Sequence, residues 1–328
     1  MPHILTAQTA ALPHALREAA SPRVLRALAP GIVLAEGAQI AAPPVFLRHI
    51  CPAEITVPLT GTLSDIAALS RAAAGLCQRL DSARSVSVQA RILEGVNLDY
   101  KPFDVNTALS KAAMATGAPL DVKAPAQIIS VTLANDAGYL GLSTPRENLS
   151  DWAGGMRRFR QEPGQISRAE FKLLEALETF AVPLPQAGRA LDLGAAPGGW
   201  TRVLRQRGMT VTAVDPAELD PRITADPGVT HARMTAERYF AGEPIPCDLL
   251  VNDMKMDAEP SAALMVHGAR LLKSGGAGIL TLKLPDEAAT WPRRVLAARG
   301  WLEKAYQIAG MRQLFHNRSE VTVYLTKL

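Results

Sequence analysis

Residues 190–200, ALDLGAAPGGW, combine a short apolar strand, a turn of small residues and the start of a helix. Small residues let a ligand approach the backbone, and the first turn of a helix presents N–H groups without intrahelical partners. Asp215 follows at the end of the next apolar run, TVTAVD, 21 residues after Gly194. A carboxylate at this distance can accept both ribose hydroxyls of an adenosine. The stretch lacks the G-x-G-x-x-G pattern of nicotinamide folds, so it predicts a different adenosine-containing cofactor.

Strands and helices alternate through the C-terminal half of the chain. Alternation of this kind is typical of an α/β fold in which a mostly parallel sheet is covered on both faces. We therefore expect a Rossmann-like, doubly wound sheet of seven strands, with ligands bound beyond the strands' carboxyl ends. Ser167 and Glu170 predict a capping box at the start of the first helix. The expected helices are 167–180, 199–207, 261–272 and 287–298, and the expected strands are 190–193, 210–214, 229–233, 248–251, 278–282, 302–308 and 321–326.

The N-terminal half has a different pattern. A strand at 85–92, a helix at 104–116 and a hairpin formed by 127–133 and 139–142 are expected from periodicity and turn residues. This β-α-β-β order, with Pro125 just before the hairpin, resembles the later half of a THUMP domain, an RNA-binding module. The resemblance covers residues 84–143 and implies a companion ferredoxin-like portion before about residue 80. A generic α+β domain of another use is the alternative.

Between these halves, residues 143–166 are rich in Pro, Gly and polar residues and lack periodicity, which predicts a linker. The expected division is an α+β RNA-binding region at 1–143, a linker at 144–166 and a catalytic domain at 167–328. The linker run Arg157, Arg158, Phe159 and Arg160, with Trp152 upstream, interleaves cations and aromatic rings in a way suited to single-stranded RNA. A solvated linker with Phe159 packed against a domain explains the run equally well.

Composition sets wider limits. The net charge of +4 permits an anionic partner without requiring one. No apolar run reaches the ~18 residues of a membrane span, and the first twenty residues do not have the pattern of a secretory signal. Three scattered cysteines, with no CxxC pair, argue against a zinc site or a disulfide framework. We therefore expect a cytoplasmic protein without a membrane partner, and the sequence does not indicate an oligomeric state.

The motif D-L-G-x-x-P-G-G-[WF], preceded by S-R-A-x-F-K-L, resembles the FtsJ-type RNA ribose 2′-O-methyltransferases. Each member of that family's Lys-Asp-Lys-Glu set has a counterpart here: Lys172 in SRAEFKL, Asp253 in VNDM, Lys283 in LTLKLP and Glu320 in RSEVTV. The segments LKLP and RQLFHNRSEVTVYL, with the THUMP-like half, extend the likeness to the family's bacterial 23S ribosomal RNA cytidine 2′-O-methyltransferases.

This resemblance implies S-adenosylmethionine-dependent 2′-O-methylation of RNA, with 23S ribosomal RNA as the expected substrate. Thr235 stands where relatives carry an acidic residue that contacts the adenine amine, so weaker adenine binding is expected. The cofactor-binding residues that the resemblance implies are Ser167, Gly194, Ala195, Ala196, Pro197, Gly198, Gly199, Trp200, Asp215, Thr235 and Asp253.

The chemistry agrees with these roles. A ribose hydroxyl is a weak nucleophile until a base removes its proton. A lysine can be that base only if burial or a second cation lowers its pKa. Lys283 follows an apolar run and is the expected base, while Lys172 is the second cation. Asp253 and Glu320 would hold the two ammonium groups, and no metal is expected because the methyl group arrives already activated.

Each of the four residues also has a purely structural interpretation. Lys172 shares a helical face with Arg168, Glu175 and Thr179, which favours a solvated lysine. Lys283 could extend its ammonium group to solvent from the end of a strand. Asp253 could cap the next helix, and Glu320 could be a charge on an edge strand. Arg312, His316 and Arg318 precede or flank Glu320 and could contact phosphates near the target ribose.

Two other functions compete with the ribose methyltransferase. RNA base methyltransferases usually place [N/D]-P-P-[Y/F] after the fourth strand, whereas this chain has Asn252, Asp253, Met254 and Lys255 there. An RNA-binding or ribosome-assembly protein with a decayed cofactor site is the non-enzymatic alternative. Thr235 favours that alternative, and the intact glycine turn and charged set argue against it.

Overall fold

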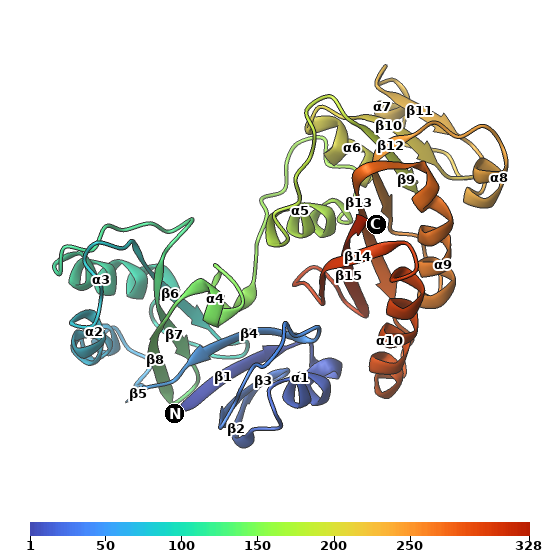
Figure 1. The fold of residues 1–328 in the computed structure, drawn as a ribbon. Coiled ribbons are helices and arrows are strands. Elements are labelled where there is room, and N and C mark those ends of the chain that lie inside the picture. The colour runs from blue at the N-terminus through green and yellow to red at the C-terminus, as the bar shows by residue number, and fades with distance from the viewer. The chain divides into compact units, whose positions relative to one another are not determined.

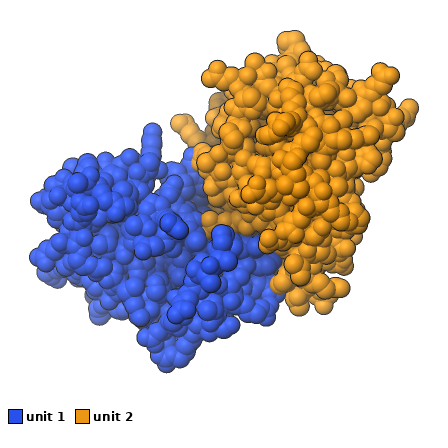
Figure 2. Space-filling model, in the orientation of Figure 1, with its two compact units in different colours: residues 1–157 blue, residues 158–328 orange.

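A computed structural model describes all residues of the chain, 1–328. Two compact units divide it, Met1–Arg157 and Arg158–Leu328 (Figure 2). The division falls within the segment predicted to be a linker. Since each unit has its own sheets and its own core, each is described separately.

The C-terminal unit is built on one seven-stranded sheet in the order β11-β10-β9-β12-β13-β15-β14 (Figure 1). The five strands from β11 to β13 are parallel to their neighbours, whereas β15 runs antiparallel between β13 and β14. This confirms the predicted doubly wound methyltransferase-type sheet. The strands are β9 (Arg189–Leu193), β10 (Thr210–Val214), β11 (Val229–Ala232), β12 (Cys247–Asn252), β13 (Leu272–Lys283), β14 (Tyr306–Arg312) and β15 (Glu320–Lys327).

Helices cover both faces of this sheet because the central strands direct apolar side chains alternately to one face and to the other. Leu249 and Val251 of β12 belong to the core that includes Leu173 and Trp200 from two of the helices. Leu250, between them, packs beside Gly268 on the other face. The helices are α5 (Glu170–Thr179), α6 (Gly199–Gln206), α7 (Pro221–Thr224), α8 (Ala236–Ala241), α9 (Ala258–Gly268) and α10 (Trp291–Leu302).

Several element boundaries differ from the prediction. Strand β13 begins at Leu272 and not at residue 278, and α9 and α10 span Ala258–Gly268 and Trp291–Leu302 where helices at 261–272 and 287–298 were expected. The strand expected at 302–308 begins only at Tyr306, because Leu302 is the last residue of α10. The helix expected from Ser167 begins at Glu170, and the side chain of Ser167 does not cap it. Only the reciprocal half of the capping box forms, since the Glu170 carboxylate accepts the N–H groups of Ile166 at 2.6 Å and Ser167 at 3.3 Å. Glu170 is buried and also pairs with Arg202 at 2.7 Å.

The N-terminal unit contains two four-stranded sheets, in the orders β2-β3-β1-β4 and β5-β8-β7-β6. Helices α2 and α3 pack together against the second sheet and share its apolar core. The strand, helix and hairpin predicted from the sequence are β6, α3, β7 and β8, so the α+β class is confirmed. The elements are β1 (Pro2–Ala7), α1 (Leu12–Glu18), β2 (Arg23–Ala29), β3 (Ile32–Glu36), β4 (Leu47–Pro52), β5 (Ile55–Pro58), α2 (Ser64–Cys77), β6 (Val86–Ile92), α3 (Pro102–Met114), β7 (Gln127–Leu133) and β8 (Ala137–Ser143).

Two features of this unit depart from expectation. The antiparallel first sheet, in the order β2-β3-β1-β4, agrees with the expected ferredoxin-like portion, but residues 37–46 contain no helix where that fold has its second one. The early part of the predicted linker is folded onto the unit as α4 (Pro145–Asn148) and a short 3₁₀ turn, Ala153–Gly155. Gly154 of that turn lies so close to Arg91 that an added Cβ would be 2.2 Å from its guanidinium.

Candidate functional site

Sheet topology brings three of the four predicted catalytic residues to one edge. Asp253 follows the last residue of β12, and Lys283 is the last residue of β13. Because β12 and β13 are parallel, their carboxyl ends meet at that edge. The antiparallel β15 begins there with Glu320, which is paired in register with Lys283. Lys172 reaches the same place from α5.

The four charged side chains form a closed cluster. Lys172 Nζ lies 2.7 Å from Glu320 Oε1 and 3.4 Å from Asp253 Oδ1. Lys283 Nζ lies 2.8 Å from Glu320 Oε1 and donates a hydrogen bond to Asp253 Oδ1. Their exposed fractions run from 13% for Glu320 to 20% for Lys283. Every predicted catalytic residue therefore meets the others in one weakly solvated place.

Thr281 is a fifth member of the cluster, which the sequence patterns did not predict. Its hydroxyl is fully buried, donates to Asp253 and receives a hydrogen bond from Lys283 Nζ at 3.3 Å. Strand periodicity could have identified it, because residues 281 and 283 of one strand point to the same face. We refer to Lys172, Asp253, Lys283, Glu320 and Thr281 as the charged cluster.

The protonation of Lys283 differs from the expectation. Burial lowers its pKa, but the neighbouring carboxylates of Asp253 and Glu320 outweigh burial, so the pKa is raised above that of an ordinary lysine. The expected lowering is therefore wrong for the protein without ligands. In this state Lys283 is an ammonium group at neutral pH.

The alternative that helical periodicity favoured, a solvated Lys172, is not what the structure shows. Glu175, on the same face as Lys172, is 3% exposed, and its carboxylate accepts the N–H groups of Phe315 at 2.9 Å and His316 at 2.8 Å. Residues 313–319, which connect β14 to β15, cover this face of the helix. Helical periodicity could not reveal that cover because it comes from residues about 140 positions further along the chain.

The turn between β9 and α6 requires its glycines. Gly194 and Gly198 have φ angles of +73° and +113°, in the left-handed region that favours glycine. An added Cβ at Gly194 would lie 2.4 Å from the side chain of Met254. Asp215 fixes the same turn, since its carboxylate accepts the N–H of Ala196 at 3.1 Å and that of Ala217 at 2.8 Å.

Three carboxylates approach one another at these strand ends. Asp192 is fully buried and accepts a 2.7 Å hydrogen bond from Thr201. Burial raises the pKa of Asp192 to about 7; the hydrogen bond from Thr201 lowers it, and the charges of Asp253 and Asp215 raise it. Such an acidic environment suits a cation. These carboxylates therefore fit S-adenosylmethionine, which carries a sulfonium and an ammonium group.

The other predicted cofactor residues differ in accessibility. Trp200 is 3% exposed, packs in the core and donates its indole N–H to Ala169 at 2.8 Å, so it supports the turn from behind. Ser167 Oγ is buried without a hydrogen-bond partner beside Gly199. Thr235 is exposed and caps α8, three residues beyond the end of β11. Ala195 is buried and Pro197 is exposed.

A cleft of about 470 Å³ opens over the charged cluster. Phe171, Phe315 and His316 supply rings to its lining, and Phe159 of the predicted linker stacks on Phe171 at a centroid distance of 5.7 Å. Phe159 thus packs against the domain, as one of its two interpretations predicted. Arg312 ends β14 and does not line the cleft. The lining residues are Arg168, Ala169, Phe171, Lys172, Phe315, His316, Arg318 and Glu320.

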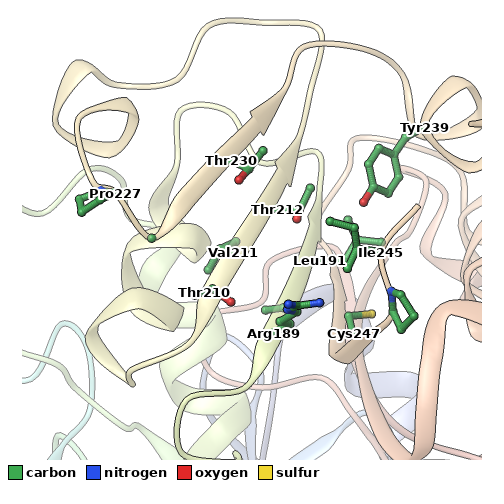
Figure 3. A pocket seen from close by; sticks show the side chains of 13 residues that line it. Arg189, Leu191, Thr210, Val211, Thr212, Pro227, Thr230, Tyr239, Ile245 and Cys247 are labelled. Carbon is green, nitrogen blue, oxygen red and sulfur yellow. The ribbon is translucent and has the colours of Figure 1, made fainter. Parts of the chain in front are cut away.

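A second hollow, of about 260 Å³, lies elsewhere on this unit (Figure 3). It includes Arg189, Thr210 and Cys247, which are the first residues of β9, β10 and β12. It contains no member of the charged cluster and no predicted cofactor residue. The amino and carboxyl edges of the same sheet therefore differ in chemistry.

Among the helices of the protein, none combines the length and the apolar character that a membrane span requires.

The sequence matches the family model described as FtsJ-like methyltransferase over residues 165–317. Three members of the Lys-Asp-Lys-Glu set lie within the match, and Glu320 lies just beyond it. The chain is 40% identical over 192 residues to ribosomal RNA large subunit methyltransferase M of Halorhodospira halophila, covering 56% of this chain and 53% of that protein. It is 32% identical over 286 residues to the protein of the same name in Cellvibrio japonicus, covering 81% of this chain and 78% of that protein.

Solved structures are more distant. TrmN from Thermus thermophilus is 14% identical, with all of both chains covered and a TM-score of 0.40. A fibrillarin/Nop5p complex is 16% identical, with 60% of this chain and 97% of that chain covered and a TM-score of 0.42. The chain spans about half the length of the first curated relatives that it matches and more than two thirds of the Cellvibrio protein.

Proposed function

Because the chain belongs to the family of ribosomal RNA large subunit methyltransferase M, we propose that it transfers a methyl group from S-adenosylmethionine to a ribose 2′-hydroxyl of ribosomal RNA. The expected substrate molecule is 23S ribosomal RNA. The observation that carries this proposal is the convergence of Lys172, Asp253, Lys283 and Glu320 within hydrogen-bonding distance, beside a turn suited to adenosine.

The residues that would hold the cofactor are those of the β9–α6 turn, with Asp215 at the adenosine ribose. When bound, S-adenosylmethionine supplies a methyl group already activated on a sulfonium. Asp215 can accept ribose hydroxyls because each carboxylate oxygen receives one backbone N–H and retains further acceptor capacity. Gly194 and Gly198 keep the turn in its tight conformation, and Trp200 supports it from the core.

Lys283 is proposed as the general base. Its Nζ lies at the centre of the cluster and must lose a proton before it can accept one from a ribose hydroxyl. Lys172, held on the same Glu320 oxygen, is a second cation that favours this loss. A cationic cofactor nearby acts in the same direction. Glu320 Oε2 is buried and has no hydrogen-bond partner, so it offers an acceptor that can orient the incoming hydroxyl.

Asp253 is proposed as the residue that positions the ammonium groups of both lysines. Thr281 fixes the Asp253 carboxylate from inside the strand. Asn252, immediately before Asp253, is fully buried and donates to Ser261 at 3.2 Å. After β12, Asp253 contacts both lysines, Met254 lies beside Gly194, and neither residue offers an aromatic surface for a base, which favours ribose methylation over base methylation.

The N-terminal unit is proposed to bind RNA. The THUMP-like order of β6, α3, β7 and β8 supports this role. A cytoplasmic location is proposed on the basis of the ribosomal RNA named for the relatives and the three unpaired, buried cysteines.

The test is mass spectrometry of nucleosides from unmethylated ribosomal RNA incubated with the protein and isotopically labelled S-adenosylmethionine. We expect the label in one 2′-O-methylated nucleoside, mapped to the large-subunit RNA. Label in a methylated base, or no RNA label despite measurable cofactor binding, would overturn the proposal. A Lys283→Met variant, which removes the amine but keeps a long side chain, is the matched control for background labelling.

A further inference from the structure

The cleft beside the charged cluster has an aromatic wall, which we define as Phe171, Phe315 and His316. The ring centroids of Phe171 and His316 lie 5.3 Å apart, and those of Phe315 and His316 lie 5.1 Å apart in an edge-on arrangement. All three side chains line the cleft and are partly exposed. Phe159 stacks on Phe171 at a centroid distance of 5.7 Å, whereas the ring contact of Phe315 is with His316 alone, so Phe315 supplies the ring best able to stack on another planar group.

The wall is held in place before any ligand arrives. Glu175 accepts the backbone N–H groups of both Phe315 and His316. Asn317, 2% exposed, accepts the N–H of Leu314 at 2.8 Å and the hydroxyl of Thr322 at 2.9 Å. Because the turn is fixed by buried hydrogen bonds, little ordering entropy is lost when its rings receive a ligand.

Charge and size define what the cleft can receive. The exposed guanidinium groups of Arg168 and Arg318 line it and suit phosphates. Lys172 and Glu320 belong both to its lining and to the charged cluster, and Glu320 Oε1 also binds Lys283 Nζ at 2.8 Å, so an occupant lies one residue away from the proposed base. Its volume of about 470 Å³ is within the range of single small-molecule sites, which fits one nucleotide and not a paired duplex.

We propose that the aromatic wall stacks the base of the nucleotide whose ribose is methylated, while Arg168 and Arg318 hold neighbouring phosphates. The substrate at this site is therefore unpaired RNA, because both faces of a base inside a duplex are already stacked on its neighbours. This inference rests on the proposed function and adds to it the conformation of the substrate and the residues that select it.

The test compares two oligomers of equal length by fluorescence anisotropy on the full chain: an oligocytidylate of about eight nucleotides and an abasic ribose–phosphate oligomer. We expect the wild-type protein to bind the oligocytidylate about 5- to 150-fold more tightly, the range for one stacked base. Phe315→Ala should remove most of this preference and leave the abasic affinity within about twofold. Unchanged S-adenosylmethionine affinity would verify that the variant is folded.

Matched substitutions separate stacking from packing. Phe315→Trp keeps an aromatic face and should retain the preference, whereas Phe315→Leu keeps apolar bulk and should lose it. Trp301→Ala, which removes an aromatic residue of α10 outside the cleft, should have no effect. Equal behaviour of Phe315→Leu and wild type, or an equal loss on both oligomers, would overturn the inference. The ribosomal RNA labelling experiment distinguishes failure of this inference from failure of the proposed function. A preference for the oligocytidylate without methylation refutes the proposed function, and methylation without that preference refutes the stacking role of the aromatic wall.

Discussion

The two units bury positive charge in different ways. In the N-terminal unit, Arg91 is 5% exposed and donates to the hydroxyls of Thr6 at 3.0 Å and Thr132 at 3.1 Å, with no carboxylate partner. Thr6 belongs to one sheet and Thr132 to the other, so the guanidinium joins the two sheets. In the C-terminal unit, the two lysines of the charged cluster share two carboxylates beside an open cleft.

The difference in partners gives opposite pKa directions. Burial lowers the pKa of Arg91, and the only opposing cause is its coulombic interaction with Cys51, a buried thiol whose own pKa burial raises. Burial also lowers the pKa of Lys283, but Asp253 and Glu320 raise it further than burial lowers it. A buried cation held only by hydroxyls serves the fold, whereas cations held by carboxylates at a cleft can exchange partners with a ligand.

The largest effect is expected from Lys283→Ala. Loss of a general base should lower turnover by about 10²–10⁴-fold while S-adenosylmethionine affinity stays within about twofold. Single-turnover kinetics with saturating cofactor, and calorimetry for the affinity, provide the two measurements. Retention of more than about a third of the turnover would remove Lys283 from this role.

Arg91→Ala should act on stability instead. Loss of two hydrogen bonds and of buried volume should reduce the free energy of unfolding of the N-terminal unit by about 2–4 kcal/mol. Cofactor affinity should not change. Denaturant titration measures the effect, with Arg71→Ala on the exposed face of α2 as a control expected to change stability by less than about 0.5 kcal/mol. Equal effects of the two substitutions would mean that Arg91 does not join the sheets.

Asp215→Ala should weaken S-adenosylmethionine binding by about 1.5–3 kcal/mol, the range for hydrogen bonds to a charged group. Part of this loss comes from the backbone N–H groups of Ala196 and Ala217, which would no longer have the Asp215 carboxylate as an acceptor. Isothermal titration calorimetry gives the value, and Glu218→Ala, an exposed residue of the same loop, is the comparison variant. An unchanged affinity would place the adenosine ribose elsewhere.

A smaller effect is expected from pH on cofactor binding. Asp192, with a pKa of about 7, is half protonated near neutrality, and its ionised form attracts a cation. Affinity for S-adenosylmethionine should therefore rise by up to about tenfold between pH 6 and 8. Asp192→Asn should remove this dependence. If the wild-type affinity is flat across this range, Asp192 does not contribute through its charge.

Much of this site could be predicted from sequence because its residues lie at ends of apolar strands. As expected, β13 ends at Lys283, β15 begins at Glu320, and Asp253 follows β12. The orientation of Lys172 could not be predicted, since it depends on the distant cover formed by residues 313–319. The sign of the Lys283 pKa shift also required structure, because distances to two carboxylates decide whether burial or ion pairing prevails.

The most direct test of the charged cluster as an acid–base site is the pH dependence of kcat/KM for RNA at saturating S-adenosylmethionine, which reports groups of the enzyme before RNA binds and is independent of the pH dependence of cofactor affinity. A base must be deprotonated, and the raised pKa of Lys283 leaves only a small neutral fraction at pH 7. We predict that log kcat/KM rises with a slope of about one from pH 6 to about 9 without a plateau, and that Lys283→Ala abolishes this rise. A plateau near neutral pH, or the same slope in Lys283→Ala, would contradict the assignment.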